Sequence, residues 1–61
     1  MSLPNPNDVE RARELWLAGD DSSVIALCEA NLSLYSALEE FIHPDDYQKL
    51  TEALQEKGVE L

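Results

Sequence analysis

The sequence predicts an all-α protein, a helical hairpin or three-helix array built around one long central helix. Apolar side chains recur at spacings of three and four residues along three segments, which is the period of a helix. Prolines and glycines are few and separate these segments, with Gly19 and Pro44 at the internal boundaries. No stretch of useful length alternates apolar and polar residues as a half-buried strand would. We therefore expect residues 1–6 to form an N-terminal arm and residues 7–61 to form a single helical domain.

The first helix is expected at residues 7–18. Asn7 is a favoured N-cap residue, and Glu10 follows it at the spacing of a capping box. Gly19 suits the left-handed position that commonly follows a helix. The apolar face of this helix consists of Val9, Ala12, Leu15 and Trp16. Leu17 points to the other side, where we expect it to be exposed.

The central helix is expected at residues 22–42, with Asp20, Asp21 and Ser22 as alternative N-caps. Its apolar side chains cover an unusually wide arc, and a helix that is apolar nearly all round is buried. Two short helices of the same chain could not easily cover this arc. We therefore expect two chains to pack together as a homodimer about a two-fold axis. The expected oligomer interface consists of Val24, Leu27, Cys28, Asn31, Leu34, Tyr35, Leu38, Phe41 and Ile42.

Asn31 projects into the middle of this apolar arc. A buried asparagine in a helical seam can fix the register and orientation of two chains at some cost in stability. The alternative is a local hydrogen bond at the edge of the seam. Both interpretations are compatible with the sequence.

The third helix is expected at residues 44–57. Pro44 suits the first helical position, which makes His43 the N-cap or its neighbour. Two aspartates follow in the first turn, where negative charge stabilises a helix. A narrow apolar stripe consists of Tyr47, Leu50 and Leu54. Gly58 fits the C-terminal cap, and Val59 can fold back over the last turn.

The chain is strongly acidic, because 13 Asp and Glu residues outnumber 4 Lys and Arg residues and give a net charge of −9. Such a chain is repelled by nucleic-acid phosphates and by anionic membranes, so we expect direct binding to neither. The longest apolar run, from Val24 to Cys28, is far shorter than the roughly 20 residues that span a bilayer. The N-terminus lacks the features of a secretory signal, and a lone cysteine forms no intrachain disulfide. We therefore expect a cytoplasmic protein.

The residues that carry chemistry are too few for a catalytic or metal site. Cys28 is the single cysteine and His43 the single histidine, and one of each cannot hold zinc. Adjacent acidic residues occur at Asp20-Asp21, Glu39-Glu40 and Asp45-Asp46. Such pairs at helix starts are better explained as helix caps and dipole partners than as acid–base groups. We expect no catalytic residue, no cofactor and no metal, hence no enzyme. A minimal enzyme would have to assemble its chemistry across a dimer interface.

The whole chain resembles the small accessory proteins encoded in the early exo–xis region of lambdoid phages. The likeness lies in its length, acidity and helical pattern. Asn5-Pro6-Asn7-Asp8 precedes a short helix, an Ala/Leu-rich segment continues through Phe41, and His43-Pro44-Asp45-Asp46 opens the last helix. The resemblance implies a non-enzymatic protein of the host cytoplasm, made early in infection, that affects the host cell cycle or the lysis–lysogeny balance through host proteins.

We therefore expect a small non-enzymatic regulatory protein that binds itself and one further protein, whose identity the sequence leaves open. Trp16 and Leu17 are candidate anchors for that partner together with Phe41, because aromatic and large apolar residues contribute strongly at interfaces. The acidic residues Glu39 and Glu40 are candidate polar contacts. One alternative is an acidic mimic of nucleic acid that blocks a basic DNA-binding protein. Another is a small structural subunit of a larger assembly.

Overall fold

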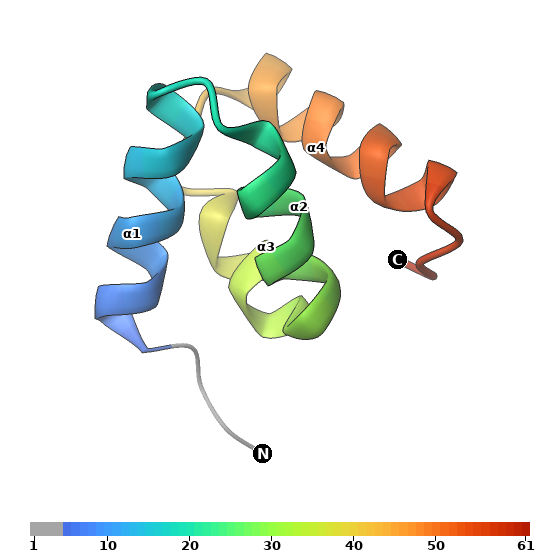
Figure 1. Ribbon diagram of the computed structural model, residues 1–61, viewed down its shortest axis with the longest axis horizontal. Coiled ribbons are helices and arrows are strands. Elements are labelled where there is room, and N and C mark those ends of the chain that lie inside the picture. The colour runs from blue at the N-terminus through green and yellow to red at the C-terminus, as the bar shows by residue number, and fades with distance from the viewer. Residues whose placement is uncertain (1–4) are drawn as a thin grey trace.

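The computed structural model describes residues 5–61, which fold into four α-helices and contain no strand (Figure 1). The helices are α1 (Pro6–Leu17), α2 (Asp21–Ala30), α3 (Leu32–Leu38) and α4 (Pro44–Glu56). The predicted all-α class is confirmed for these residues. α2 is central, since it packs against each of the other three helices, and α1 also contacts α3. Figure 1 shows the C-terminal half of α4 extending away from α1.

The prediction of a single central helix at residues 22–42 is wrong, because the helix is interrupted at Asn31. This residue is extended, with φ −146° and ψ 96°. Its N–H closes α2 by donating to the Leu27 and Cys28 carbonyls at 3.0 and 3.2 Å. Its side-chain oxygen opens α3 by accepting from the Ser33 N–H at 3.1 Å. Asparagine amides compete in this way with helix continuation, so Asn31 is an exposed cap between two helices.

The break changes how the apolar side chains are covered. α2 and α3 pack against each other, and α1 and α4 cover what remains. The buried core consists of Val9, Ala12, Val24, Cys28, Leu34, Leu38, Leu50 and Leu54. The premise that helices of one chain could not cover the arc is therefore corrected. The homodimer stays a prediction, but the excess apolar surface from which it was inferred is covered within the chain.

The helix ends follow local rules, with one correction. α1 begins one residue earlier than expected, and its cap is Asn5, whose side chain accepts from the Asn7 N–H at 2.9 Å. The expected capping box at Asn7 and Glu10 is wrong, because Pro6 takes the first helical position and leaves the cap to the residue before it. α4 begins at Pro44 as expected and ends one residue earlier, and His43 is its N-cap.

The two glycines predicted to end helices, Gly19 and Gly58, both adopt the left-handed conformation. Gly19 has φ 86° and Gly58 has φ 88°, a region that glycine enters without the steric penalty of a Cβ. Val59 then folds back as predicted, because its N–H bonds to the Leu54 carbonyl at 3.0 Å and its side chain packs against the core. Among residues 5–61, no helix combines the length and apolar character needed to cross a membrane.

A cluster of Tyr35, Tyr47 and Thr51 joins α3 to α4. The Thr51 hydroxyl donates to the Tyr47 carbonyl at 2.9 Å. Its one proton is thereby used, so the Tyr35 hydroxyl is the donor in the bond between Tyr35 and Thr51. Burial raises the pKa of the Tyr47 hydroxyl above its usual range, and its hydrogen bond with Tyr35 adds to the rise. The cluster fixes α3 on α4 without leaving a buried side-chain polar atom unpaired among the described residues.

Candidate functional site

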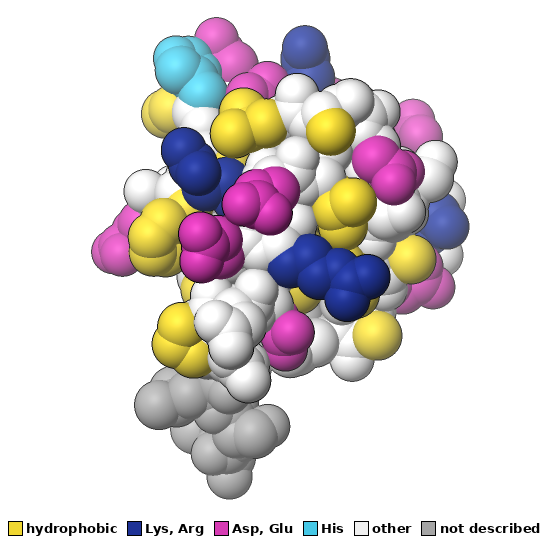
Figure 2. All heavy atoms as spheres, turned by 60° about the vertical axis from the view of Figure 1, so that its left-hand side comes forward, with side chains coloured by type: hydrophobic (Ala, Val, Ile, Leu, Met, Phe, Trp, Pro, Cys, Tyr) yellow, Lys and Arg dark blue, Asp and Glu magenta, His cyan; other side chains and the backbone are white. Residues whose placement is uncertain are grey.

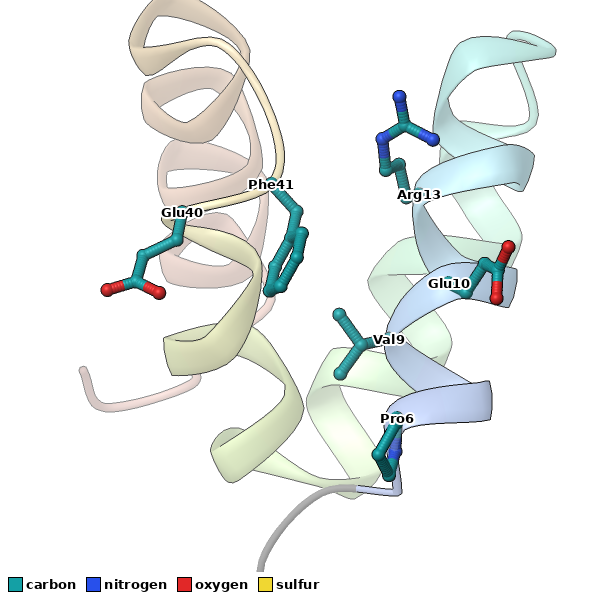
Figure 3. Close-up of a pocket in the computed structure, with 6 residues that line it drawn as sticks. All are labelled: Pro6, Val9, Glu10, Arg13, Glu40 and Phe41. Atoms are coloured by element: carbon teal, nitrogen blue, oxygen red, sulfur yellow. The ribbon is translucent and has the colours of Figure 1, made fainter.

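An open groove lies between the N-terminal half of α1 and the turn that follows α3 (Figure 3). It has a volume of about 620 Å³. α1 supplies one wall, and the turn supplies the other. The lining residues are Pro6, Val9, Glu10, Arg13, Glu40 and Phe41. Because the groove combines apolar and charged side chains at the surface, it is a candidate binding site.

The centre of the groove is apolar. Phe41 and Val9 face each other across it (Figure 3), and Phe41 is 52% exposed while Val9 is 7% exposed. The turn holds Phe41 outward, because the N–H groups of Phe41 and Ile42 both donate to the Leu38 carbonyl, at 2.9 and 3.2 Å. Ile42 then packs against the core and leaves its neighbour at the surface. A large aromatic ring thus stands beside the hydrophobic core without being covered by it.

The edges of the groove carry charge. In Figure 3 the carboxylates of Glu10 and Glu40 point away from the central gap on its two sides, and the Arg13 side chain extends along the α1 wall. None of these three residues forms an ion pair within residues 5–61, where Lys57 pairs with Glu29 at 3.7 Å. The groove therefore has an apolar centre between two carboxylates that no cation of the described residues pairs.

The sequence that follows the α1 wall of the groove is acidic. From Glu14 to Gln48 the chain contains no lysine or arginine and eight of its 13 acidic residues. On the α1 side of the molecule, acidic, basic and apolar side chains are interspersed, and the basic ones do not gather into a patch (Figure 2). This surface lacks the cluster of basic groups that recognises nucleic-acid phosphates.

The structure separates the residues predicted at the oligomer interface. Val24, Cys28, Leu34 and Leu38 are in the core of the single chain. Leu27, Tyr35 and Ile42 are half-buried against that core. Asn31 is an exposed cap, and Phe41 is an exposed groove residue. Other helices of the same chain cover the four core residues, so these four side chains do not support the predicted interface, which stays a prediction.

The four predicted partner-binding residues also divide. Trp16 packs partly buried against the core, whereas Leu17 is 66% exposed at the end of α1. Glu39 and Glu40 are both exposed, and only Glu40 lines the groove. The α1 wall, formed by Pro6, Val9, Glu10 and Arg13, was not predicted from the sequence. No sequence pattern pairs the start of α1 with the turn after α3, because the break at Asn31 creates this proximity.

The two residues singled out for reactivity have structural surroundings. Cys28 is fully buried, and burial raises the pKa of its thiol from 9.0 to about 11, which suppresses the nucleophilic thiolate. His43 accepts a hydrogen bond at Nδ1 from the Asp45 N–H at 3.1 Å, as an N-cap does. The burial of Cys28 supports a role in packing, and the hydrogen bond of His43 supports a role in capping.

Comparison with known proteins adds no relative. No protein-family model, curated protein or solved structure matches this chain. The resemblance to accessory proteins of lambdoid phages therefore stays a prediction, and the geometry of the groove is what bears on function.

Proposed function

We propose that this chain is a small non-enzymatic protein that acts by binding another protein through the groove between α1 and the turn after α3. The observation that carries the proposal is the half-exposed ring of Phe41, which faces Val9 beside the core. Large aromatic residues in partly enclosed, apolar surroundings commonly dominate the energy of protein interfaces. A regulatory role in a phage-infected host, which the resemblance implies, would be one use of such binding.

The energy available at Phe41 is enough to matter. Burying the exposed half of a phenylalanine removes about 100 Å² of apolar surface from water, which is worth about 2.5 kcal/mol before the cost of association. The carboxylates of Glu10 and Glu40 would lie at the rim, where polar contacts set orientation more than affinity. The groove therefore has the apolar centre and polar rim of a small protein-binding site.

Site-specific photo-crosslinking tests this proposal in cells that produce the protein. A photoreactive phenylalanine analogue is placed at position 41 and, as a matched control, at Leu32, which is 43% exposed and lies outside the groove. A partner crosslinked from position 41 and not from position 32 supports the proposal. A third variant carries the analogue at Leu17. Crosslinking from position 17 alone would place the partner at the end of α1 and contradict the groove as the site.

A further inference from the structure

We propose that the groove takes a basic segment of a partner protein, in which one large apolar side chain is flanked by lysine or arginine. This inference rests on the proposed function and names the chemistry of the occupant. Its basis is the arrangement of the groove itself. Apolar side chains line the centre, and at each side lies a carboxylate that no cation among residues 5–61 pairs.

The apolar centre sets the first requirement. Phe41, Val9 and Pro6 present a surface that gains from contact with an aliphatic or aromatic side chain. A partner residue inserted there lies between Glu10 on α1 and Glu40 on the turn. Because the two carboxylates point outward on opposite sides of the gap, charged residues of the partner on either side of the anchor would meet them at the edges of the groove. The placement of the two carboxylates thus favours a positive charge on each side of the apolar residue.

The charge of the whole molecule sets the second requirement. A second copy of the chain carries the same net charge of −9 and would be repelled. Nucleic acids and anionic lipid surfaces are disfavoured for the same reason. A basic protein segment is attracted by the net negative charge of the chain and pairs locally with Glu10 and Glu40 at the rim. Among these occupants, charge complementarity therefore selects the basic segment.

Arg13 differs from Glu10 and Glu40 because its charge is positive, so neutralising it should change the affinity in the opposite direction. It is the one basic residue of the lining and forms no ion pair within the described residues. A basic segment must pass near its guanidinium. Neutralising Arg13 should therefore strengthen binding of that segment, whereas neutralising Glu10 or Glu40 should weaken it.

The experiment selects short random peptides displayed on a carrier against the immobilised full chain. Peptides that depend on Phe41 are identified by counter-selection on the F41A variant. The enriched peptides are expected to contain one large apolar residue flanked by lysine or arginine, and to bind more weakly at high salt. The affinity of one such synthetic peptide is then measured for each charge variant.

The expected changes are small and opposite in sign. Glu10→Gln and Glu40→Gln should each weaken the peptide about twofold to fivefold, the range for an exposed ion pair. Glu56→Gln alters the net charge equally but lies on α4 outside the groove lining, and should leave the affinity nearly unchanged. Arg13→Gln should tighten binding, and Lys49→Gln is its matched control on α4.

The other outcomes separate this inference from the proposed function. Neutral or acidic apolar peptides that still require Phe41 would overturn the basic occupant and leave the groove as a protein-binding site. A library without any Phe41-dependent peptide would overturn the groove function itself. A dimer in sedimentation equilibrium that F41A abolishes would make a second copy the occupant and overturn the basic segment. Equal weakening by Glu40→Gln and Glu56→Gln would reduce the effect to net charge and contradict local pairing.

Discussion

The phenol rings of Tyr35 in α3 and Tyr47 in α4 stack with their centroids 4.7 Å apart and their planes inclined by 16°. The Tyr47 hydroxyl also donates to the backbone carbonyl of Tyr35 at 3.0 Å. The Glu39 N–H, which would take this carbonyl if α3 continued, donates instead to the Ser36 carbonyl at 3.4 Å. Tyr47 therefore satisfies a carbonyl in the last turn of a helix of 7 residues, a length that is not stable alone in water.

Tyr47→Phe should destabilise the protein by about 1–2 kcal/mol, because it leaves a partly buried carbonyl without its donor while the stacked ring remains. The free energy of unfolding in urea, followed by circular dichroism, measures this loss. Gln48→Ala is a control, since Gln48 is exposed on the same helix. An unchanged midpoint for Tyr47→Phe would show that water replaces the hydroxyl without loss.

The start of α4 and the C-terminal ends of α1 and α4 could be predicted to within one residue because their signals are local, namely Gly19, Pro44 and Gly58. The start of α1, expected at Asn7, lies one residue earlier at Pro6. The break at Asn31 could not be predicted from spacing alone, because apolar residues continue across it. The pattern of buried residues nevertheless reflects the break. Val24 and Cys28 form one buried pair, and Leu34 and Leu38 form another. The six residues from Cys28 to Leu34 would turn a continuous helix by about 600°, so the two pairs would face different sides of it. The wide apolar arc is therefore two narrow stripes, one for each helix.

Asn31→Ala should destabilise the protein by about 1 kcal/mol, because α3 loses the side-chain acceptor for the Ser33 N–H. Alanine favours a continuous helix, but α2 and α3 each bury their own stripe, so the helical content should not rise. Thermal unfolding and far-ultraviolet circular dichroism measure the two effects. Asn31→Asp retains a capping oxygen and should stay close to the native stability. A gain in helix on Asn31→Ala would show that the break depends on this one side chain.

The groove was less accessible to sequence reasoning than the helices. Phe41 was expected at an interface because it is large and apolar, and the structure does leave it exposed. Val9 was expected on the core-facing side of the first helix, where it lies, yet it also borders the groove. What the sequence did not reveal is that these residues face each other. That relation requires α3 to run back beside α1, which follows from the reversal at Asn31.

Stability should fall between pH 9.0 and about 11 as a result of burial at Cys28. The pKa of this thiol is raised in the folded state, so the native protein holds the proton longer than the unfolded chain does. The contribution is therefore fully present below pH 9.0 and is lost as the pH rises through the folded pKa of about 11. Tyr47 acts in the same direction from about pH 10 upward.

Urea unfolding of the native protein and of Cys28→Ala across this range tests the assignment. Cys28→Ala lowers stability at every pH by leaving a small cavity, but its stability should fall less steeply between pH 9.0 and about 11. The slope is thus the informative quantity. Identical slopes for the two proteins would assign the alkaline loss to the tyrosines instead.

Phe41→Ala and Leu38→Ala should separate the surface from the core. Leu38 is 1% exposed, and its truncation should cost about 2–5 kcal/mol through lost burial and a cavity. Phe41 lies three residues further along, and about half of its side chain already contacts water. Its truncation should therefore cost about 1 kcal/mol or less. Urea unfolding of both variants under the same conditions provides the comparison. If Phe41→Ala destabilises the protein as much as Leu38→Ala does, the ring is needed to hold the turn. It would then not be available to bind a partner.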